Sequence, residues 1–112
     1  MKLPGGDQAN VDIAKLRDYR LNPHRPRGRH KARVFTAVLG LTQADVESLQ
    51  SALLQVASEL DAVEGLTDEY GTRFTIDFEL QIEQRRAKVR SAWILLHDEH
   101  APRLSSCYVL LD

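Results

Sequence analysis

Midway along this chain of 112 residues, the spacing of the apolar side chains changes from helical to extended. Over residues 43–60 they recur every three or four positions, which predicts one long amphipathic helix. Over residues 74–80 they alternate with polar residues, which predicts a strand with one buried and one wet face. Helices followed by strands predict an α+β domain.

Two shorter helices are expected before the long one. Asp12 is placed to cap the first of them with its side-chain oxygen. The second is expected over residues 29–39 and ends at Gly40, a residue type that commonly follows a helix. Thr42 followed by Asp45 resembles a capping box at the start of the long helix, with Asp in place of Glu.

Three strands are expected in the C-terminal half, over residues 74–80, 87–96 and 103–111. The connections between them are short, which favours an antiparallel meander. The helical half, about residues 9–60, should pack on one face of this sheet half, about residues 72–111. Residues 61–69 are rich in Asp and Glu and are expected to form a linker.

Composition narrows the class of protein. A chain of 112 residues that is 43% hydrophobic predicts a single domain over residues 1–112. Its one cysteine, Cys107, excludes an internal disulfide framework and fits a reducing compartment. No apolar run has the length of a signal peptide core or a membrane span, so we expect a cytoplasmic protein without membrane contact.

Positive charge is concentrated before the long helix. Between Asp18 and Asp45 there is no carboxylate, although the whole chain has a formal net charge of -1. A concentrated basic patch on a neutral protein is typical of anion binding. Lys31 lies at the inner edge of a helix N-terminus, where a bound anion would be favoured. The alternative is that Lys31 extends past Phe35 into water.

Two strands carry a serine followed two residues later by an aromatic side chain. Ser91 precedes Trp93, and Ser106 precedes Tyr108. We expect both pairs on the uncovered face of the sheet, where they are able to stack bases and hold phosphate. The helix-covered side is then assigned to two sets, Ala92, Ile94 and Leu96 on one strand and Cys107, Val109 and Leu111 on the other. An ordinary role of aromatic pairs in stabilising the sheet is the alternative.

Several short motifs are spread over nearly the whole chain: Leu21-Asn22-Pro23, His30-Lys31-Ala32, Leu39-Gly40-Leu41, Tyr70-Gly71, residues 89–94 and residues 102–109. Together they resemble a bacterial family of small domains of unknown function. Related sequences are similar to toxin modules of contact-dependent and other polymorphic toxins, and to products of toxin–antitoxin-like loci. The layout resembles the metal-independent ribonuclease group that includes barnase, EndoU, RelE and colicin D.

The resemblance implies an endoribonuclease that cleaves RNA through attack by the ribose 2′-hydroxyl, with no metal and no cofactor. It assigns the general acid or base to His30 and transition-state stabilisation to Lys31. The catalytic set is His30, Lys31, Ser91, Ser106 and Tyr108, and the RNA- and phosphate-binding set is His24, Arg27, Arg29, Trp93 and Arg103.

The implied partners are RNA, with tRNA among the candidates, and a small acidic antitoxin or immunity protein. As part of a longer toxin, the domain would be delivered into the cytoplasm of a target cell. Two other functions remain open. The same basic residues and aromatics would serve a non-catalytic nucleic-acid- or protein-binding module of a toxin–antitoxin-like locus. His97 and His100, with acidic residues between them, would serve a metal-dependent hydrolase.

Overall fold

The structure is a computed structural model that describes residues 1–24 and 29–111, with the side chain of Tyr19 excepted. The predicted phosphate ligand Arg27 lies outside the described residues. Helical segments come first: η1 (Gly6–Gln8), α1 (Ile13–Lys15) continued by the π-helical η2 (Leu16–Arg20), α2 (Arg29–Leu39), η3 (Gln43–Asp45) and α3 (Val46–Glu59). The strands are β1 (Val63–Thr67), β2 (Gly71–Ile82), β3 (Arg85–Leu96) and β4 (Arg103–Val109). The predicted α+β order is confirmed.

The predicted helix ends are also confirmed. The Asp12 carboxylate accepts hydrogen bonds from the backbone N–H groups of Ala14 and Lys15, at 3.0 and 3.2 Å. Thr42 and Asp45 form a capping box ahead of α3. Gly40 ends α2 with a φ of +72°, a conformation that L side chains rarely adopt. These short-range signals fix where α1 begins, where α2 ends and where the helical stretch of η3 and α3 begins.

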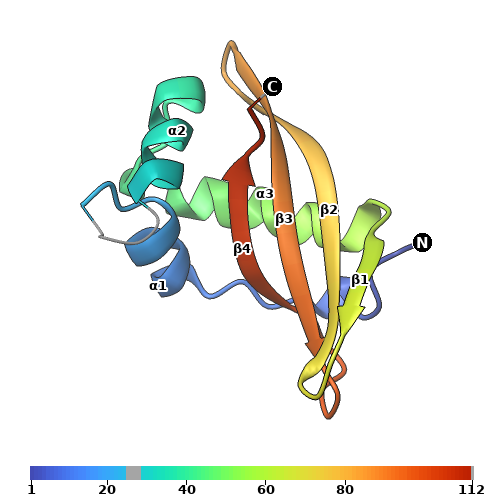
Figure 1. Cartoon of the computed structure of the whole chain (residues 1–112). Coiled ribbons are helices and arrows are strands. Elements are labelled where there is room, and N and C mark those ends of the chain that lie inside the picture. Colours follow the sequence, from blue (N-terminus) through green and yellow to red (C-terminus); the bar gives the residue numbers. More distant parts are fainter. Residues whose placement is uncertain (25–28, 112) are drawn as a thin grey trace.

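The four strands form one antiparallel sheet in the order β1-β2-β3-β4, a meander. Figure 1 shows α3 crossing behind the sheet and α2 standing beside the β4 edge, so one face of the sheet is left open. Among the described residues, no helix has the length and apolar character needed to cross a membrane.

The expectation of a linker over residues 61–69 was wrong. Residues 63–67 form β1, which pairs with β2 through partners such as Glu64 and Phe74. All five residues of β1 are exposed, so no buried face imposes an alternating pattern on their sequence. Pairing with the longer neighbour β2, rather than burial, makes this segment a strand.

The faces assigned to β3 were also wrong. Trp93 lies opposite Phe74, and Ser91 lies opposite Ile76, on the side that packs against the helices. Ala92 and Ile94 lie on the open face instead. Apolar residues occupy both faces of β3, so alternation within the strand does not determine its phase. The phase is set by the register with β2, whose alternation is unambiguous.

The faces assigned to β4 were correct around Cys107. Cys107 and Val109 are buried, whereas Ser106 and Tyr108 are on the open face. The register shifts between Ala92 and Trp93, so Ser105 is an extra residue on β4. This bulge brings Leu104 opposite Trp93.

Candidate functional site

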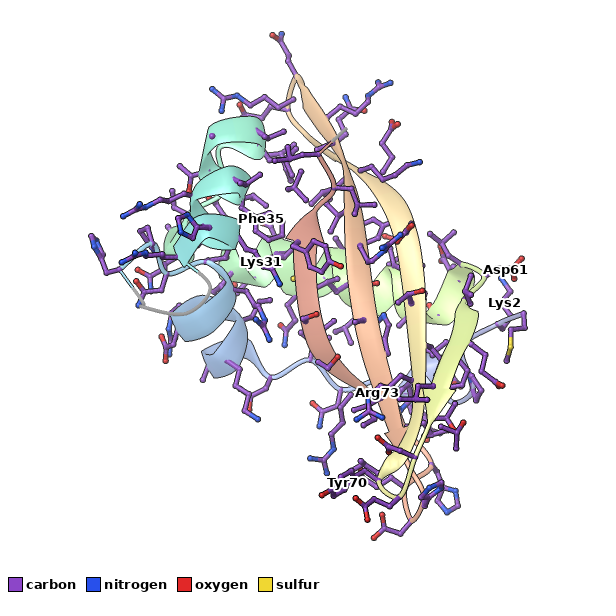
Figure 2. All side chains as sticks on the ribbon, in the orientation of Figure 1. Lys2, Lys31, Phe35, Asp61, Tyr70 and Arg73 are labelled. Carbon is purple, nitrogen blue, oxygen red and sulfur yellow. The ribbon has the colours of Figure 1, made fainter. Side chains whose placement is uncertain are left out.

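A cationic side chain meets an aromatic ring where α2 stands against β4. The Lys31 ammonium nitrogen is 4.4 Å from the centre of the Tyr108 ring. Ala32 and Phe35 are buried and fix α2 against the domain, and Lys31 is at the rim of that buried stripe. Figure 2 shows Lys31 and Phe35 extending from α2 toward β4. A contact of this kind is worth about 0.5–1 kcal/mol at an exposed site.

A second cation is held beside Tyr108 on the open face. Arg90 is the cross-strand partner of both Tyr108 on β4 and Asp77 on β2. Its guanidinium donates two hydrogen bonds to the Asp77 carboxylate, at 2.8 and 2.9 Å. This pair raises the pKa of Arg90, with a smaller contribution from Tyr108, and lowers the pKa of Asp77. Arg90 is therefore fixed in place with its charge intact.

A third cation, Arg20, is bound to the same edge strand, β4. The bulge at Ser105 leaves its backbone carbonyl free to accept a hydrogen bond from Arg20 at 2.6 Å, while its hydroxyl donates to the Ala92 carbonyl. Burial raises the pKa of the Cys107 thiol to about 12, and the nearby charges of Arg20 and Lys31 act in the opposite direction. Both cations therefore lie close to Cys107.

We call the group Arg20, Lys31, Arg90, Ser106 and Tyr108 the β4-edge site. It combines positive charge with hydroxyl groups on the face of the sheet that the described helices leave open. In the part of the chain that the structure describes, no carboxylate forms an ion pair with Lys31, whereas Arg90 is paired with Asp77. Lys31 is thus available to an anion.

Two predicted site residues are in the core and do not belong to this site. Ser91 and Trp93 have no exposed surface. The Trp93 indole N–H donates to the Ser91 hydroxyl at 2.9 Å, and that hydroxyl donates to the Ile76 carbonyl at 2.9 Å. All the polar atoms of the pair are satisfied internally. Because both side chains are buried, the prediction that RNA stacks on Trp93 and contacts Ser91 is wrong.

The other predicted residues that the structure describes lie outside the β4-edge site, apart from those already placed in it. His24, Arg29 and His30 are exposed near the start of α2. His30 precedes Lys31 directly and is therefore rotated from it by about 100° around the helix. Arg103 lies at the opposite end of β4 from Tyr108 and is paired with Glu99, which raises its pKa. The structure brings Lys31, Ser106 and Tyr108 to one edge and leaves Arg103 apart.

The histidines considered for a metal site have other surroundings. His97 Nε2 donates a hydrogen bond to the Asp68 carbonyl at 2.7 Å, and His100 is exposed. Within residues 1–24 and 29–111, no group of three or more His, Cys, Asp or Glu side chains is arranged to hold a metal ion.

Comparison with known proteins gives one match. A family model described as a domain of unknown function, DUF6883, matches residues 2–111. Neither the curated proteins nor the solved structures contain a match to the chain.

Proposed function

The chain belongs to the DUF6883 family, whose description states no activity, and we propose that it is an endoribonuclease whose active centre is the β4-edge site. The reaction is attack of a ribose 2′-hydroxyl on the adjacent phosphate, ending in a 2′,3′-cyclic phosphate and a free 5′-hydroxyl. In this proposal the domain acts as a toxin module, and its neutralising partner is a small acidic protein.

One observation carries the proposal, the position of the Lys31 ammonium over the Tyr108 ring. A phosphate at that point meets the Lys31 ammonium, the Tyr108 hydroxyl and the guanidinium of Arg90. Cations aimed at a phosphorane stabilise the negative charge that grows in the transition state. In this proposal the side chains of Lys31 and Arg90 supply the positive charge that stabilises the phosphorane.

The proton movements assign the other roles. As the 2′-oxygen bonds to phosphorus, a base takes its proton, and as the bond to the 5′-oxygen breaks, an acid returns one. The His30 imidazole takes the proton of the 2′-hydroxyl and the Tyr108 hydroxyl protonates the leaving 5′-oxygen, after which proton exchange with solvent restores both groups. Lys31 and Ser106 hold the non-bridging oxygens. His30 is rotated from Lys31 by about 100° around α2, so His30→Ala separates the role of the imidazole from that of the ammonium.

The test is incubation of purified protein with total tRNA and a labelled oligoribonucleotide in EDTA. Lys31→Ala should lower the cleavage rate by about 10²–10³-fold, as expected for a group that stabilises the transition state. Tyr108→Phe and His30→Ala should each lower it by about 10²–10⁴-fold if they transfer protons. The matched control is Arg33→Ala, another exposed cation of α2, which lines a hollow with Pro23 away from β4.

The outcomes separate the two candidate functions. Cleavage by the wild type and by Arg33→Ala, but not by Lys31→Ala, supports a ribonuclease. If Lys31→Ala and Tyr108→Phe lose cleavage activity while His30→Ala keeps full activity, the imidazole takes no part in the mechanism. Intact RNA with the wild type, at concentrations where RNA binding is measured, contradicts catalysis and favours a non-catalytic RNA- or protein-binding module that uses the same Lys31 and Tyr108 surface.

A further inference from the structure

A cavity of about 320 Å³ opens between the α1–η2 helix and the start of β4. This volume is near the lower end of the range for small-molecule sites, about 300–1,000 Å³, so the cavity suits one ring system. Two leucines, two cations, a carboxylate and a serine line it: Asp12, Lys15, Leu16, Arg20, Leu104 and Ser105.

The polar groups of the cavity are held in place by the fold. Asp12 is fixed by the backbone N–H groups that it caps, the nearer at 3.0 Å. Arg20 is fixed by its 2.6 Å hydrogen bond to the Ser105 carbonyl. Leu104 is half-buried and supplies an apolar wall, and Leu16 is buried directly behind the lining. A nucleobase has this combination of flat apolar faces and an edge of donors and acceptors.

The cavity adjoins the proposed active centre. Arg20 lines the cavity and donates its hydrogen bond to Ser105, the residue directly before Ser106 of the β4-edge site. Ser105 and Tyr108 are three positions apart on β4, which corresponds to about 10 Å along a strand. That separation is comparable to the length of one nucleotide from its base edge to its phosphate.

We propose that this cavity binds the base of the nucleotide that adjoins the scissile phosphate, an inference that rests on the function proposed above. The phosphate lies at Lys31 and Tyr108, and the base enters between the α1–η2 helix and β4. Leu104 contacts one face of the base, with Leu16 buried behind it, while Arg20, Lys15 and Asp12 contact its edge. The cavity thereby gives the enzyme a preference among the four bases at one position.

The experiment titrates the four nucleoside 3′-monophosphates into the protein and follows the methyl resonances of Leu16 and Leu104 by NMR. At least one nucleotide should shift both resonances. Ser105→Phe fills the cavity from an exposed position and should lower the affinity for that nucleotide about 10-fold, the loss expected for one base contact. Lys15→Glu, a charge reversal at the exposed rim, should also lower the affinity for the nucleotide. The control is Ser48→Phe, on an exposed site of α3, which should bind as the wild type does.

Two results would overturn the inference. One is identical behaviour of all four nucleotides and inorganic phosphate, which would mean that only the phosphate is bound. The other is unchanged nucleotide affinity in folded Ser105→Phe and Lys15→Glu. A cleavage assay on the same samples separates this inference from the proposed function. Intact RNA with base binding in the cavity refutes the ribonuclease alone, whereas cleavage with the same base preference in Ser105→Phe and wild type refutes the cavity alone.

Discussion

The pairs Ser91–Trp93 and Ser106–Tyr108 have the same spacing on neighbouring strands, yet they lie on opposite faces of the sheet. In the first pair, the serine hydroxyl joins the indole to a backbone carbonyl inside the core. In the second, the aromatic ring contacts Lys31 at the open edge. Ser91 pairs with Cys107, so Ser106 and Tyr108 lie on the other face, and the bulge at Ser105 changes the phase only toward the start of β4. The same local motif therefore packs in the core on one face of the sheet and contacts a cation at the open edge on the other.

The largest difference between the pairs should appear when the aromatic rings are removed. Trp93→Ala should destabilise the protein by about 3–5 kcal/mol, because it leaves a cavity in the core. Tyr108→Ala should cost about 1 kcal/mol, the value of its contact with Lys31 and some packing. Urea unfolding followed by circular dichroism measures both, since it does not depend on Trp93 fluorescence. Equal losses would mean that Tyr108 is a packing residue and would weaken its assignment to the site.

Removal of the serine hydroxyls should give a smaller contrast. Ser91→Ala leaves the buried Trp93 N–H without its acceptor, which should cost about 1–3 kcal/mol. Ser106→Ala changes a half-buried position on the open face and should stay within about 0.5 kcal/mol. The same unfolding experiment applies, and a double variant of Ser91 and Trp93 should show non-additive losses. Additive losses would contradict the hydrogen bond between them.

The smallest effect should come from the ion pair that holds Arg90. Asp77→Asn should cost about 1 kcal/mol or less at neutral pH, because the pair is partly solvent-exposed. The pKa of Asp77 is lowered in the folded state, so the stabilisation is present above its ordinary value of 3.8 and is lost as the pH falls through the folded value. Wild type and variant should converge in urea unfolding at acid pH. Glu79→Gln breaks a more exposed pair with Arg86 and is the matched control.

Short-range chemistry made much of the fold predictable. The side chains of Asp12, Thr42 and Asp45 act on backbone groups within three residues, so their effect is readable from sequence alone. The inner position of Lys31 on α2 followed from the same kind of local spacing. Its partner did not, because the Tyr108 contact depends on how α2 meets β4.

Long-range register accounts for the errors. Arg90 was not anticipated because its pairing with Asp77 depends on a tight turn in which Ile82 pairs with Arg85. Glu83 in that turn has a φ of +55°, which the sequence does not signal with a glycine. Trp93 was misplaced because the strand is apolar on both faces, and β1 was missed because it is exposed on both. In each case, pairing with the neighbouring strand determines the structure, and the sequence of the segment itself does not reveal it.

The meander has a consequence for folding. Every strand pairs with its neighbour along the chain, so the sheet grows from local hairpins. The contact between Lys31 and Tyr108 has no such local route, since it joins the helical half to β4. Contacts that close long loops carry a higher entropic cost and form late. Arg90 and Tyr108 are neighbours within one hairpin, whereas Lys31 joins them only where α2 is packed against β4.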